Sequence, residues 1–272
     1  MAQNPEPGNA VTRTLERTGR AAANGVEEVG VWTMMLVESV FWVFAGRSYK
    51  QPVRLAAIFA QMMEVGVQAI PIVGIMAAAI GVMLAIQGIY SLSIFGAESQ
   101  VTYGIAFSVV REFAPMITGI LVAGRSGSAL AARIGTMKIN QEIDALHVMG
   151  INPVRFLVAP ALIAMVIMVP ALTFFSDCVG LLAAGLYVSA DLDMSMAAYA
   201  QRLIDALGVG DVIHGLIKSV IFAVLICLIG VVNGASVRGG AEGVGKVTTR
   251  SVVQAISAII VTDMIFAFVA TR

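Results

Sequence analysis

The stretch "VTYGIAFSVVREFAPMITGILVAG", residues 101–124, decides the fold class of this chain. It is mostly apolar and longer than the roughly 20 residues that an α-helix needs to cross the hydrocarbon core of a bilayer. Near its centre, however, it carries Arg111 and Glu112, and a charged side chain there costs at least about 2.5–3.5 kcal/mol. The stretch therefore predicts a membrane-spanning helix whose two charged side chains face a cavity or another helix.

The composition of the whole chain also indicates a membrane protein. Hydrophobic residues make up 58% of the sequence and charged residues 12%, whereas soluble domains carry about 25% charge. The net charge is zero and no basic tract is present, so we expect no nucleic-acid partner. Cys178 and Cys227 lie in apolar runs and are interpreted as packing residues. We expect neither a metal site nor a cofactor.

Five segments are predicted to span the membrane, which makes this an all-α membrane protein. The boundaries are about 65–90, 101–124, 156–190, 212–235 and 251–270. The third segment is overlong and contains Pro160 and Pro170. We interpret it as one long helix, tilted or kinked, that projects from the membrane; a re-entrant pair of helices is the less favoured alternative.

The N-terminal part of the chain is divided into a polar segment, 1–28, and a short apolar segment, 29–45. The first 25 residues hold no apolar core, so we expect no cleavable signal peptide. The segment 29–45 contains both tryptophans and Glu38 and is short for a span. We therefore predict a helix that lies in the membrane interface, rather than a sixth span.

The distribution of lysine and arginine predicts the topology. A cytoplasmic N-terminus places thirteen of the seventeen basic residues in cytoplasmic segments: Arg13, Arg17, Arg20, Arg47, Lys50, Arg54, Arg125, Arg133, Lys138, Arg155, Arg238, Lys246 and Arg250. The outer loop 191–211 holds only Arg202, and the outer loop 91–100 holds none. We therefore expect the N-terminus in the cytoplasm and the C-terminus outside.

Two motifs suggest catalysis, but neither is supported by its context. "GRSG", residues 124–127, matches an intramembrane serine protease motif, yet such an enzyme needs a histidine within hydrogen-bond reach of Ser126. His214 is expected at the opposite face of the membrane, and His147 lies in a polar segment. "GAEGVGKV", residues 240–247, resembles a phosphate-binding loop, but Val247 replaces the required hydroxyl residue. We place this motif in a loop of about 15 residues between spans, and expect no nucleotide site.

Small residues follow the second span at helical spacing. Gly124, Ser128 and Ala132 share one predicted helix face, and a neighbouring face is formed by Gly127, Ala131 and Gly135. Small residues at this spacing allow helix backbones to approach closely in a membrane. We therefore predict that the second span continues into the cytoplasm as a closely packed helix.

Arg111 and Glu112 are the main candidates for a functional site. Adjacent residues on a helix point about 100° apart, so each side chain requires its own partner. The candidate partners are Glu64, Asp177, Lys218 and Asp263, and an anionic headgroup is a further candidate for Arg111. A structural ion pair and a ligand contact both remain open. Pro115 is expected to bend this helix and help to open a cavity.

Residues 138–153, "KINQEIDALHVMGINP", are predicted to form a short cytoplasmic helix between the second and third spans. Ile143, Leu146 and Met149 make an apolar stripe, while Gly150 can cap the helix and Pro153 stops it. The stripe either seats the helix on its own protein or docks into a groove on a cytoplasmic partner.

Several separated motifs resemble one family. The sequence "EFAPMITGILVAGRSGSALAARIGTMKINQEIDALHVMGINPVRFLVAP" is similar to the signature of MlaE-type permeases, the membrane subunits of ABC transporters associated with MCE proteins. "GVMLAIQG", "GLIKSVIFAVLICLIGVVNG" and "GVGKVTTRSVV" resemble the same family. The similarity runs from about residue 50 to the C-terminus, so 29–272 is taken as one permease domain.

The resemblance implies a non-catalytic permease of a bacterial inner membrane. It implies a homodimer, a cytoplasmic ABC ATPase dimer, a periplasmic MCE ring, often a STAS-domain protein, and phospholipid as cargo. The segment "EIDALHVMGINP" would be the coupling helix, with Arg111 and Glu112 near the lipid cavity. The candidate coupling residues are Glu142, Ile143, Asp144, Leu146, Met149 and Gly150.

Two positions depart from the family pattern. An acidic residue is common where Arg133 stands, and an arginine is common where Ala161 follows Pro160. The two changes are reciprocal in charge, so we expect a rearranged salt bridge between the coupling region and the third span.

The leading hypothesis is a phospholipid permease powered by a partner ATPase. Met76, Met83 and Leu84 are candidates for the apolar wall of its cavity, and Arg111 for the headgroup contact. The alternatives are an importer of an apolar solute such as a sterol, and a membrane scaffold that transports nothing. No inverted internal repeat, of the kind that would suggest a secondary transporter, is visible in the sequence.

Overall fold

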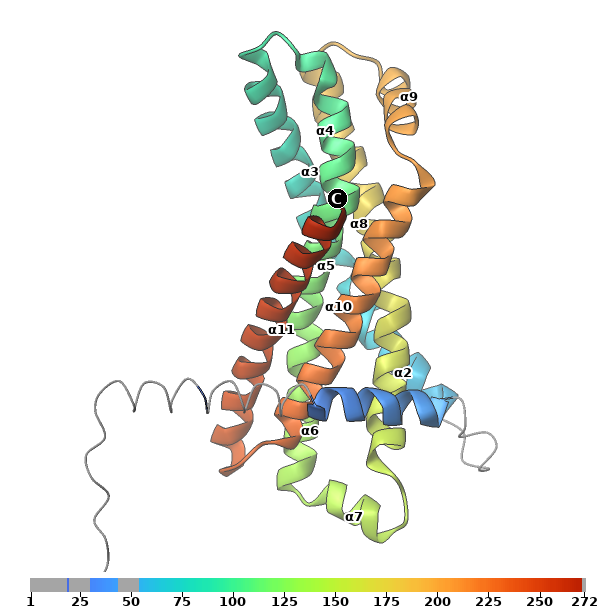
Figure 1. Ribbon diagram of the computed structural model, residues 1–272, viewed down its shortest axis with the longest axis vertical. Helices are drawn as coiled ribbons and strands as arrows, with labels where there is room; N and C mark the ends of the chain where they lie inside the picture. Colours follow the sequence, from blue (N-terminus) through green and yellow to red (C-terminus); the bar gives the residue numbers. More distant parts are fainter. Residues whose placement is uncertain (1–18, 20–29, 44–53, 271–272) are drawn as a thin grey trace, which may run out of the picture.

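The computed structural model describes residues 19, 30–43 and 54–270, and these residues are almost entirely helical (Figure 1). Five helical runs are long and apolar enough to cross a membrane, as the sequence predicts. They are Leu55–Ser93, Glu98–Ile139, Val154–Asp191, Val209–Ala235 and Gly240–Val269. The predicted all-α fold with five spans is therefore confirmed.

The first run begins ten residues earlier than the predicted span. It consists of α2 (Leu55–Val65), a 3₁₀ turn (Val67–Ala69) and α3 (Ile70–Ser93). On α2, Leu55 and Phe59 are exposed apolar side chains, which suit a helix that meets the bilayer rather than water.

The helix Gly30–Val43 precedes this run and lies across the bundle, crosswise to the spans (Figure 1). It is too short to cross the hydrocarbon core. Glu38 accepts a hydrogen bond from the Asn152 side chain, with 2.7 Å between Nδ2 and Oε1. Both the orientation and this polar contact agree with the predicted interfacial helix; residues 1–18, 20–29 and 44–53 lie outside the described part of the chain.

The second run contains two π-helical segments. It consists of α4 (Val101–Phe107), the π-segment η3 (Ser108–Phe113), α5 (Ala114–Val122), the π-segment η4 (Ala123–Gly127) and α6 (Ser128–Ile139). Single π-turns inside α-helices are frequent at functional sites. Here Arg111 and Glu112 lie in the first π-segment.

Close packing of small residues joins the second run to α10 (Val209–Ala235). A Cβ atom on Gly230 would come within 3.0 Å of the Gly127 carbonyl oxygen, and one on Gly234 within 2.7 Å of the Ala131 carbonyl oxygen. Of the two predicted small-residue faces, the one with Gly127, Ala131 and Gly135 therefore makes the contact. Gly124, on the other face, has open space around it.

The third run is a single long helix. The π-segment η5 (Val154–Val158) leads into α8 (Ala159–Asp191), which continues through Pro170 without a break. It packs along α3, where Gly81 and Gly180 meet backbone to backbone. The interpretation as one long helix is confirmed, and the re-entrant alternative is not.

The last helix corrects one prediction. Residues 240–247 were expected in a loop, but α11 (Gly240–Ala270) already begins there. Lys246 and Glu242 form an ion pair one helical turn apart, at 2.6 Å, so the lysine lies on a helix surface and not in a phosphate-binding loop. The loop between α10 and α11 is thus much shorter than expected because α11 extends past its apolar part.

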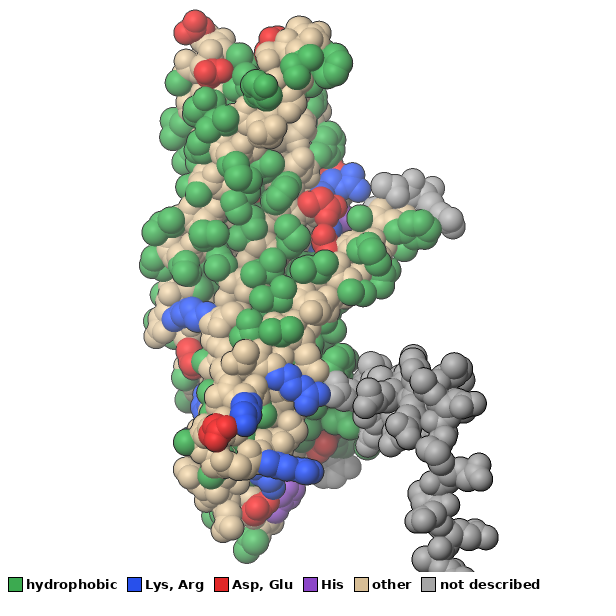
Figure 2. Space-filling model, turned by 90° about the vertical axis from the view of Figure 1, so that its left-hand side faces the viewer, with side chains coloured by type: hydrophobic (Ala, Val, Ile, Leu, Met, Phe, Trp, Pro, Cys, Tyr) green, Lys and Arg blue, Asp and Glu red, His purple; other side chains and the backbone are tan. Residues whose placement is uncertain are grey.

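The two ends of the bundle differ in structure. One end carries α7 (Glu142–Val148), and the opposite end carries α9 (Met196–Ala206), a helix that the sequence analysis did not foresee (Figure 1). We call these the α7 end and the α9 end. Figure 2 shows lysine and arginine side chains gathered on the half of the molecule nearer α7, whereas the other half is largely apolar.

Candidate functional site

The site is built on a backbone irregularity in the second span. Because proline has no N–H, Pro115 cannot donate the α-helical hydrogen bond to the carbonyl oxygen of Arg111, four residues earlier. The Lys218 ammonium group of α10 donates to this oxygen instead, at 3.0 Å. Gly215, one turn before Lys218, allows the approach, because a Cβ atom there would collide with the Val110 carbonyl oxygen.

Lys218 also pairs with two carboxylates from two other helices. Its Nζ lies 2.5 Å from Glu112 Oε2 in η3 and 2.6 Å from Asp263 Oδ1 in α11. The lysine side chain is fully buried. A buried ammonium group is very costly unless it is paired and hydrogen-bonded. Here Lys218 donates hydrogen bonds to the Arg111 carbonyl oxygen and to Glu112, and it forms an ion pair with Asp263. The cluster therefore ties α10, α11 and the second span together at one point.

Arg111 has a different partner. Its Nη1 lies 3.7 Å from Asp211 Oδ1, near the start of α10. Asp211 also caps that helix, since its Oδ2 accepts a hydrogen bond from the Gly208 N–H at 3.0 Å. The sequence places Asp211 at the end of the predicted outer loop 191–211, and Asp211 is not among the partners predicted for Arg111. The signal that could have found it is its position three residues after Gly208, at the start of an apolar run.

Of the four partners suggested by the sequence, the structure brings two to the site. Lys218 and Asp263 are in the cluster, whereas Glu64 lies 4.0 Å from Arg133 instead. Asp177 is buried in α8, and its Oδ1 has no hydrogen-bond partner among the described residues. Lys218 therefore forms the ion pair with Glu112, whereas Arg111 pairs with Asp211, a residue that sequence spacing alone could not place beside it.

The cluster is only partly covered. About a third of the Arg111 and Glu112 side chains is exposed, compared with none of Lys218. Figure 2 shows acidic and basic side chains together beside the C-terminal end of α11, where that helix stands away from the rest. Charged groups on a membrane-spanning helix cannot face lipid tails without a large cost. This side of the subunit must therefore face either another protein surface or a polar cavity.

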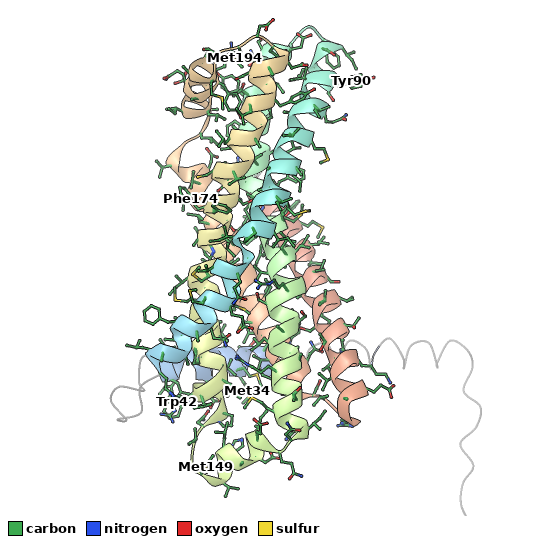
Figure 3. All side chains as sticks on the ribbon, turned by 180° about the vertical axis from the view of Figure 1, so that it is seen from behind. Met34, Trp42, Tyr90, Met149, Phe174 and Met194 are labelled. Carbon is green, nitrogen blue, oxygen red and sulfur yellow. The ribbon has the colours of Figure 1, made fainter. Side chains whose placement is uncertain are left out.

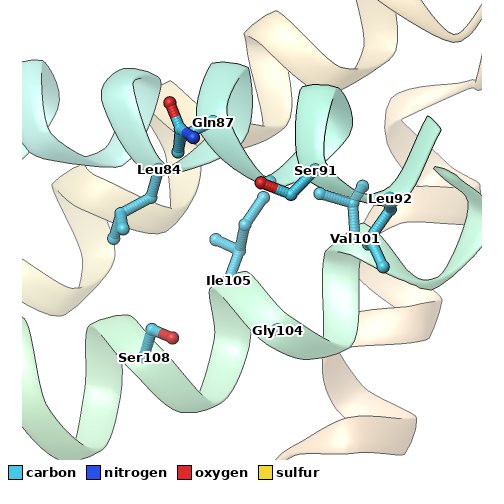
Figure 4. Close-up of a pocket in the computed structure, with 9 residues that line it drawn as sticks. Leu84, Gln87, Ser91, Leu92, Val101, Gly104, Ile105 and Ser108 are labelled. Carbon is cyan, nitrogen blue, oxygen red and sulfur yellow. The ribbon is translucent and has the colours of Figure 1, made fainter. Parts of the chain in front are cut away.

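A cavity of about 230 Å³ lies between α3 and α4, toward the α9 end (Figure 4). Leu84, Val101 and Ile105 give it apolar walls, and Gln87 and Ser108 add polar groups. Ser108 begins the π-segment that carries Arg111. The cavity thus reaches the first residue of the π-segment, whereas Arg111 and Glu112 are not among the residues that line it.

The three candidate wall residues of α3 do not share one environment. Leu84 is half-buried and lines this cavity, whereas Met76 and Met83 lie exposed, seven residues apart on one outer face of the helix. An exposed apolar face on a spanning helix contacts either lipid or a neighbouring subunit.

The predicted coupling residues at the α7 end fall into a buried group and an exposed group. Leu146 is buried and Ile143 packs against the core, so this part of the stripe seats the helix on its own protein. Glu142, Asp144, Met149 and Gly150 are exposed. Met149 lies at the tip of the molecule, with Tyr90 and Met194 at the opposite end (Figure 3).

Val148, which the sequence analysis did not name as a coupling residue, is the most exposed apolar side chain of this helix, at 88%. Gly150 ends the helix with a left-handed backbone, φ 73°, and its N–H donates to the His147 carbonyl at 3.0 Å. The predicted glycine cap is therefore confirmed, and it leaves Val148 and Met149 projecting together.

Comparisons with known proteins agree with this architecture. The family described as Permease MlaE matches residues 58–269. A "Probable ABC transporter permease protein" of Rickettsia typhi is 33% identical over 250 residues, which cover 88% of this chain and 96% of the relative.

Two further relatives extend the similarity to other bacteria. A permease named in the same way from Synechocystis is 36% identical over 75% of this chain and 77% of its own length. The "Intermembrane phospholipid transport system permease protein MlaE" of Haemophilus influenzae is 33% identical over 75% of this chain and 79% of its own length. With five spans and a family match over most of its length, this chain belongs to the MlaE permease family and is a multi-pass membrane permease subunit of the ABC transporter type.

Proposed function

We propose that this permease moves phospholipid between the inner and outer membranes of a bacterial envelope. The observation that carries the proposal is the partly exposed cluster of Arg111, Glu112, Lys218 and Asp263 on the membrane-spanning helices. An apolar cavity lined in part by Leu84 reaches Ser108, the first residue of the π-segment that carries Arg111. An apolar wall for acyl chains and an arginine for a phosphate group are the two features that a phospholipid requires. The name of the Haemophilus influenzae relative supports the same cargo.

The exposed position of the cluster supports a second copy of the chain as the partner on that side. In the most apolar stretch of α11, only 11% of the residues are buried within the subunit. Asp263 lies on this helix. Two copies that face each other would enclose both clusters in one central cavity, so that no charge meets lipid tails. In this arrangement Met76 and Met83 are proposed to line the cavity or the contact between the copies.

The two ends are proposed to meet different partners in the inner membrane. We infer that the α7 end is cytoplasmic, because basic side chains gather there; the N-terminus is then cytoplasmic and the C-terminus periplasmic. Val148 and Met149 would insert into an ABC ATPase dimer, with Glu142 and Asp144 beside them. A periplasmic MCE ring would contact the α9 end, and a STAS-domain protein would be a further subunit of the cytoplasmic assembly.

The chain itself is proposed to be non-catalytic. ATP hydrolysis on the partner would move α7, which follows α6 after a short turn at Asn140 and Gln141. Since α6 continues the helical run that holds Arg111, this motion can reach the cavity through one rigid element. Arg111 would hold the lipid phosphate while Lys218 keeps Glu112 and Asp263 in place.

The experiment is phospholipid transfer between vesicles by the complex purified from its host, with wild-type and Arg111→Ala permease. We expect transfer to fall about tenfold or more, as loss of a charge-assisted hydrogen bond predicts, with an unchanged melting temperature. Arg238→Ala, an exposed arginine in the loop between α10 and α11, is the matched control and should transfer normally.

A complex with a hydrolysis-dead ATPase separates transport from scaffolding. If transfer is the same with the dead ATPase, or if Arg111→Ala transfers at the wild-type rate, the proposed function is wrong. Transfer of a sterol but not of phospholipid would select the alternative cargo.

A further inference from the structure

A further site with basic side chains lies at the α7 end, away from the charged cluster around Lys218. A cavity of about 340 Å³ opens between α2, α6 and the beginning of α8. Its lining includes two arginines, Arg54 and Arg133, together with the polar side chain of Gln61. The remaining wall is apolar and is formed by Ala57, Ala60, Met137, Phe156, Leu157 and Pro160.

The contacts within this cavity hold both guanidinium groups at its surface. Arg54 lies over the Phe156 ring, with 5.6 Å between its Cζ and the ring centroid. This stacking fixes the plane of the guanidinium group and leaves its N–H edges available. With the Gln61 amide oriented to satisfy both groups, its oxygen accepts hydrogen bonds from Arg133 Nη1 and Nη2 at 2.5 and 2.9 Å.

The acidic side chains near the cavity do not neutralise it. Glu64 Oε2 lies 4.0 Å from Arg133 Nη1, and both side chains are more than 40% exposed, so this pair is weak and leaves Arg133 accessible. Glu64 does not line the cavity. A third arginine, Arg125, is close by and donates to the Glu64 carbonyl oxygen and to the Gln68 side chain. The cavity therefore has an excess of positive charge.

The position of the cavity indicates what can enter it. Its wall includes residues of α2, and α2 lies near the level at which the helix Gly30–Val43 runs across the bundle (Figure 1). On the same α2, Leu55, Phe59 and Met63 are exposed apolar side chains, as expected where the chain meets the bilayer. Basic pockets between spanning helices at this depth bind the headgroups of anionic lipids.

We propose that Arg54 and Arg133 bind the phosphate group of an anionic phospholipid in this cavity, in the leaflet on the α7 side. The guanidinium groups supply charge-assisted hydrogen bonds to the phosphate oxygens, and the Phe156 side of the cavity contacts the apolar part of the lipid. This site is separate from the charged cluster at Arg111 and does not rest on the proposed transport function. Bound there, the lipid joins α2 to α6, the helix that leads into α7.

The test uses the full-length protein in its complex, reconstituted with an equimolar mixture of phosphatidylglycerol and phosphatidylcholine. After extraction in mild detergent, native mass spectrometry counts the retained lipids. We expect the Arg54→Gln/Arg133→Gln variant to retain about tenfold less phosphatidylglycerol than the wild type. The matched control is Arg238→Gln/Lys246→Gln, which removes two charges from the same end, outside the cavity, and should retain the wild-type amount.

Further arms identify the source of the phosphate and separate this site from the transport cavity. In phosphatidylcholine alone, added inorganic phosphate should not raise the melting temperature; a rise in the wild type but not in the variant, without retained phosphatidylglycerol, would assign the site to a soluble phosphate instead. An Arg111→Ala background should leave the loss unchanged. Equal retention of phosphatidylglycerol by wild type and by the Arg54/Arg133 variant would overturn the proposal.

Discussion

Two lysines of this protein make ion pairs of nearly the same length in opposite surroundings. Lys218 lies 2.5 and 2.6 Å from two carboxylates and is fully buried between the spanning helices. Lys246 lies 2.6 Å from Glu242 on the first turns of α11, and both side chains are more than 75% exposed. The distance between two charges therefore does not measure how much their ion pair contributes to the stability of the protein. The cost of leaving a charge unpaired depends on whether it is buried or exposed to water.

The largest expected effect separates these two lysines. Lys218→Met leaves Glu112 and Asp263 without their shared cation, which should destabilise the protein by about 3–5 kcal/mol, the usual cost of breaking a buried pair. Lys246→Met should change stability by no more than about 0.5 kcal/mol. Denaturant unfolding in detergent micelles, followed by tryptophan fluorescence, measures both.

A second variant shows whether pairing is the cause. In Lys218→Met/Asp263→Asn/Glu112→Gln all three charges are removed, so much of the lost stability should return. Equal, small effects of Lys218→Met and Lys246→Met would mean that the cluster is solvated, contrary to its burial.

The second prediction concerns the exposed apolar tip of the α7 end. Val148→Asp/Met149→Asp should weaken association with the ATPase by about 2 kcal/mol or more, as expected for anchor residues, while the isolated subunit keeps its melting temperature. Pull-down of the ATPase and ATP hydrolysis by the complex are the measurements. The matched control is Ile204→Asp, on α9, where the side chain is 71% exposed. Normal assembly of the double variant would remove these residues from the interface.

The third prediction tests the close approach that lets Lys218 reach the second span. Gly215→Val places a side chain against the Val110 carbonyl oxygen, and should cost about 1–3 kcal/mol through overpacking. At the α7 end, Gly245 lies inside α11 with open space around it. Gly245→Ala should therefore be neutral or stabilise the helix by up to about 1 kcal/mol. The same unfolding measurements test both variants. A Gly215→Val variant with an unchanged free energy of unfolding would contradict the close packing of Gly215 against Val110.

The smallest expected effect on stability concerns Tyr199, a buried and neutral side chain at the α9 end, in contrast to the two charged lysines. Tyr199 of α9 is 2% exposed, and its hydroxyl donates to the Leu181 carbonyl at 3.0 Å. Burial raises the pKa of Tyr199 to about 12. Because the folded pKa exceeds the unfolded value near 10, the stabilisation is complete below pH 10 and is lost as the pH rises through about 12.

Tyr199→Phe removes this group, and should cost about 1 kcal/mol at neutral pH through the lost hydrogen bond. Melting temperatures measured from neutral pH to pH 12 should then fall less steeply for the variant than for the wild type. Parallel curves would show that Tyr199 does not contribute to the alkaline loss of stability.

Much of the fold was predictable because the bilayer imposes a simple rule on length and polarity. The five spans, the single long helix through Pro170 and the interfacial helix all follow from apolar length and the position of tryptophan. The start of α11 was missed, because residues 240–250 are polar and glycine-containing, and apolar length shows only the part of a helix that crosses lipid. The helix α9 was missed for the same reason.

For the candidate site, the sequence determined which residues needed partners, and only the tertiary structure decided which partners they have. A charge in an apolar run is visible without coordinates because its burial is costly wherever it points. The ion pairs depend on how each helix is rotated and how far it is shifted along its axis. These two variables decide which carboxylate reaches Lys218 and that Arg111 pairs with Asp211. They also decide that Glu64 and Arg133 meet at the α7 end. Both variables are set by backbone contacts such as Gly215 against Val110 and Gly234 against Ala131. Such contacts join residues far apart in the chain, so no local pattern in the sequence contains them.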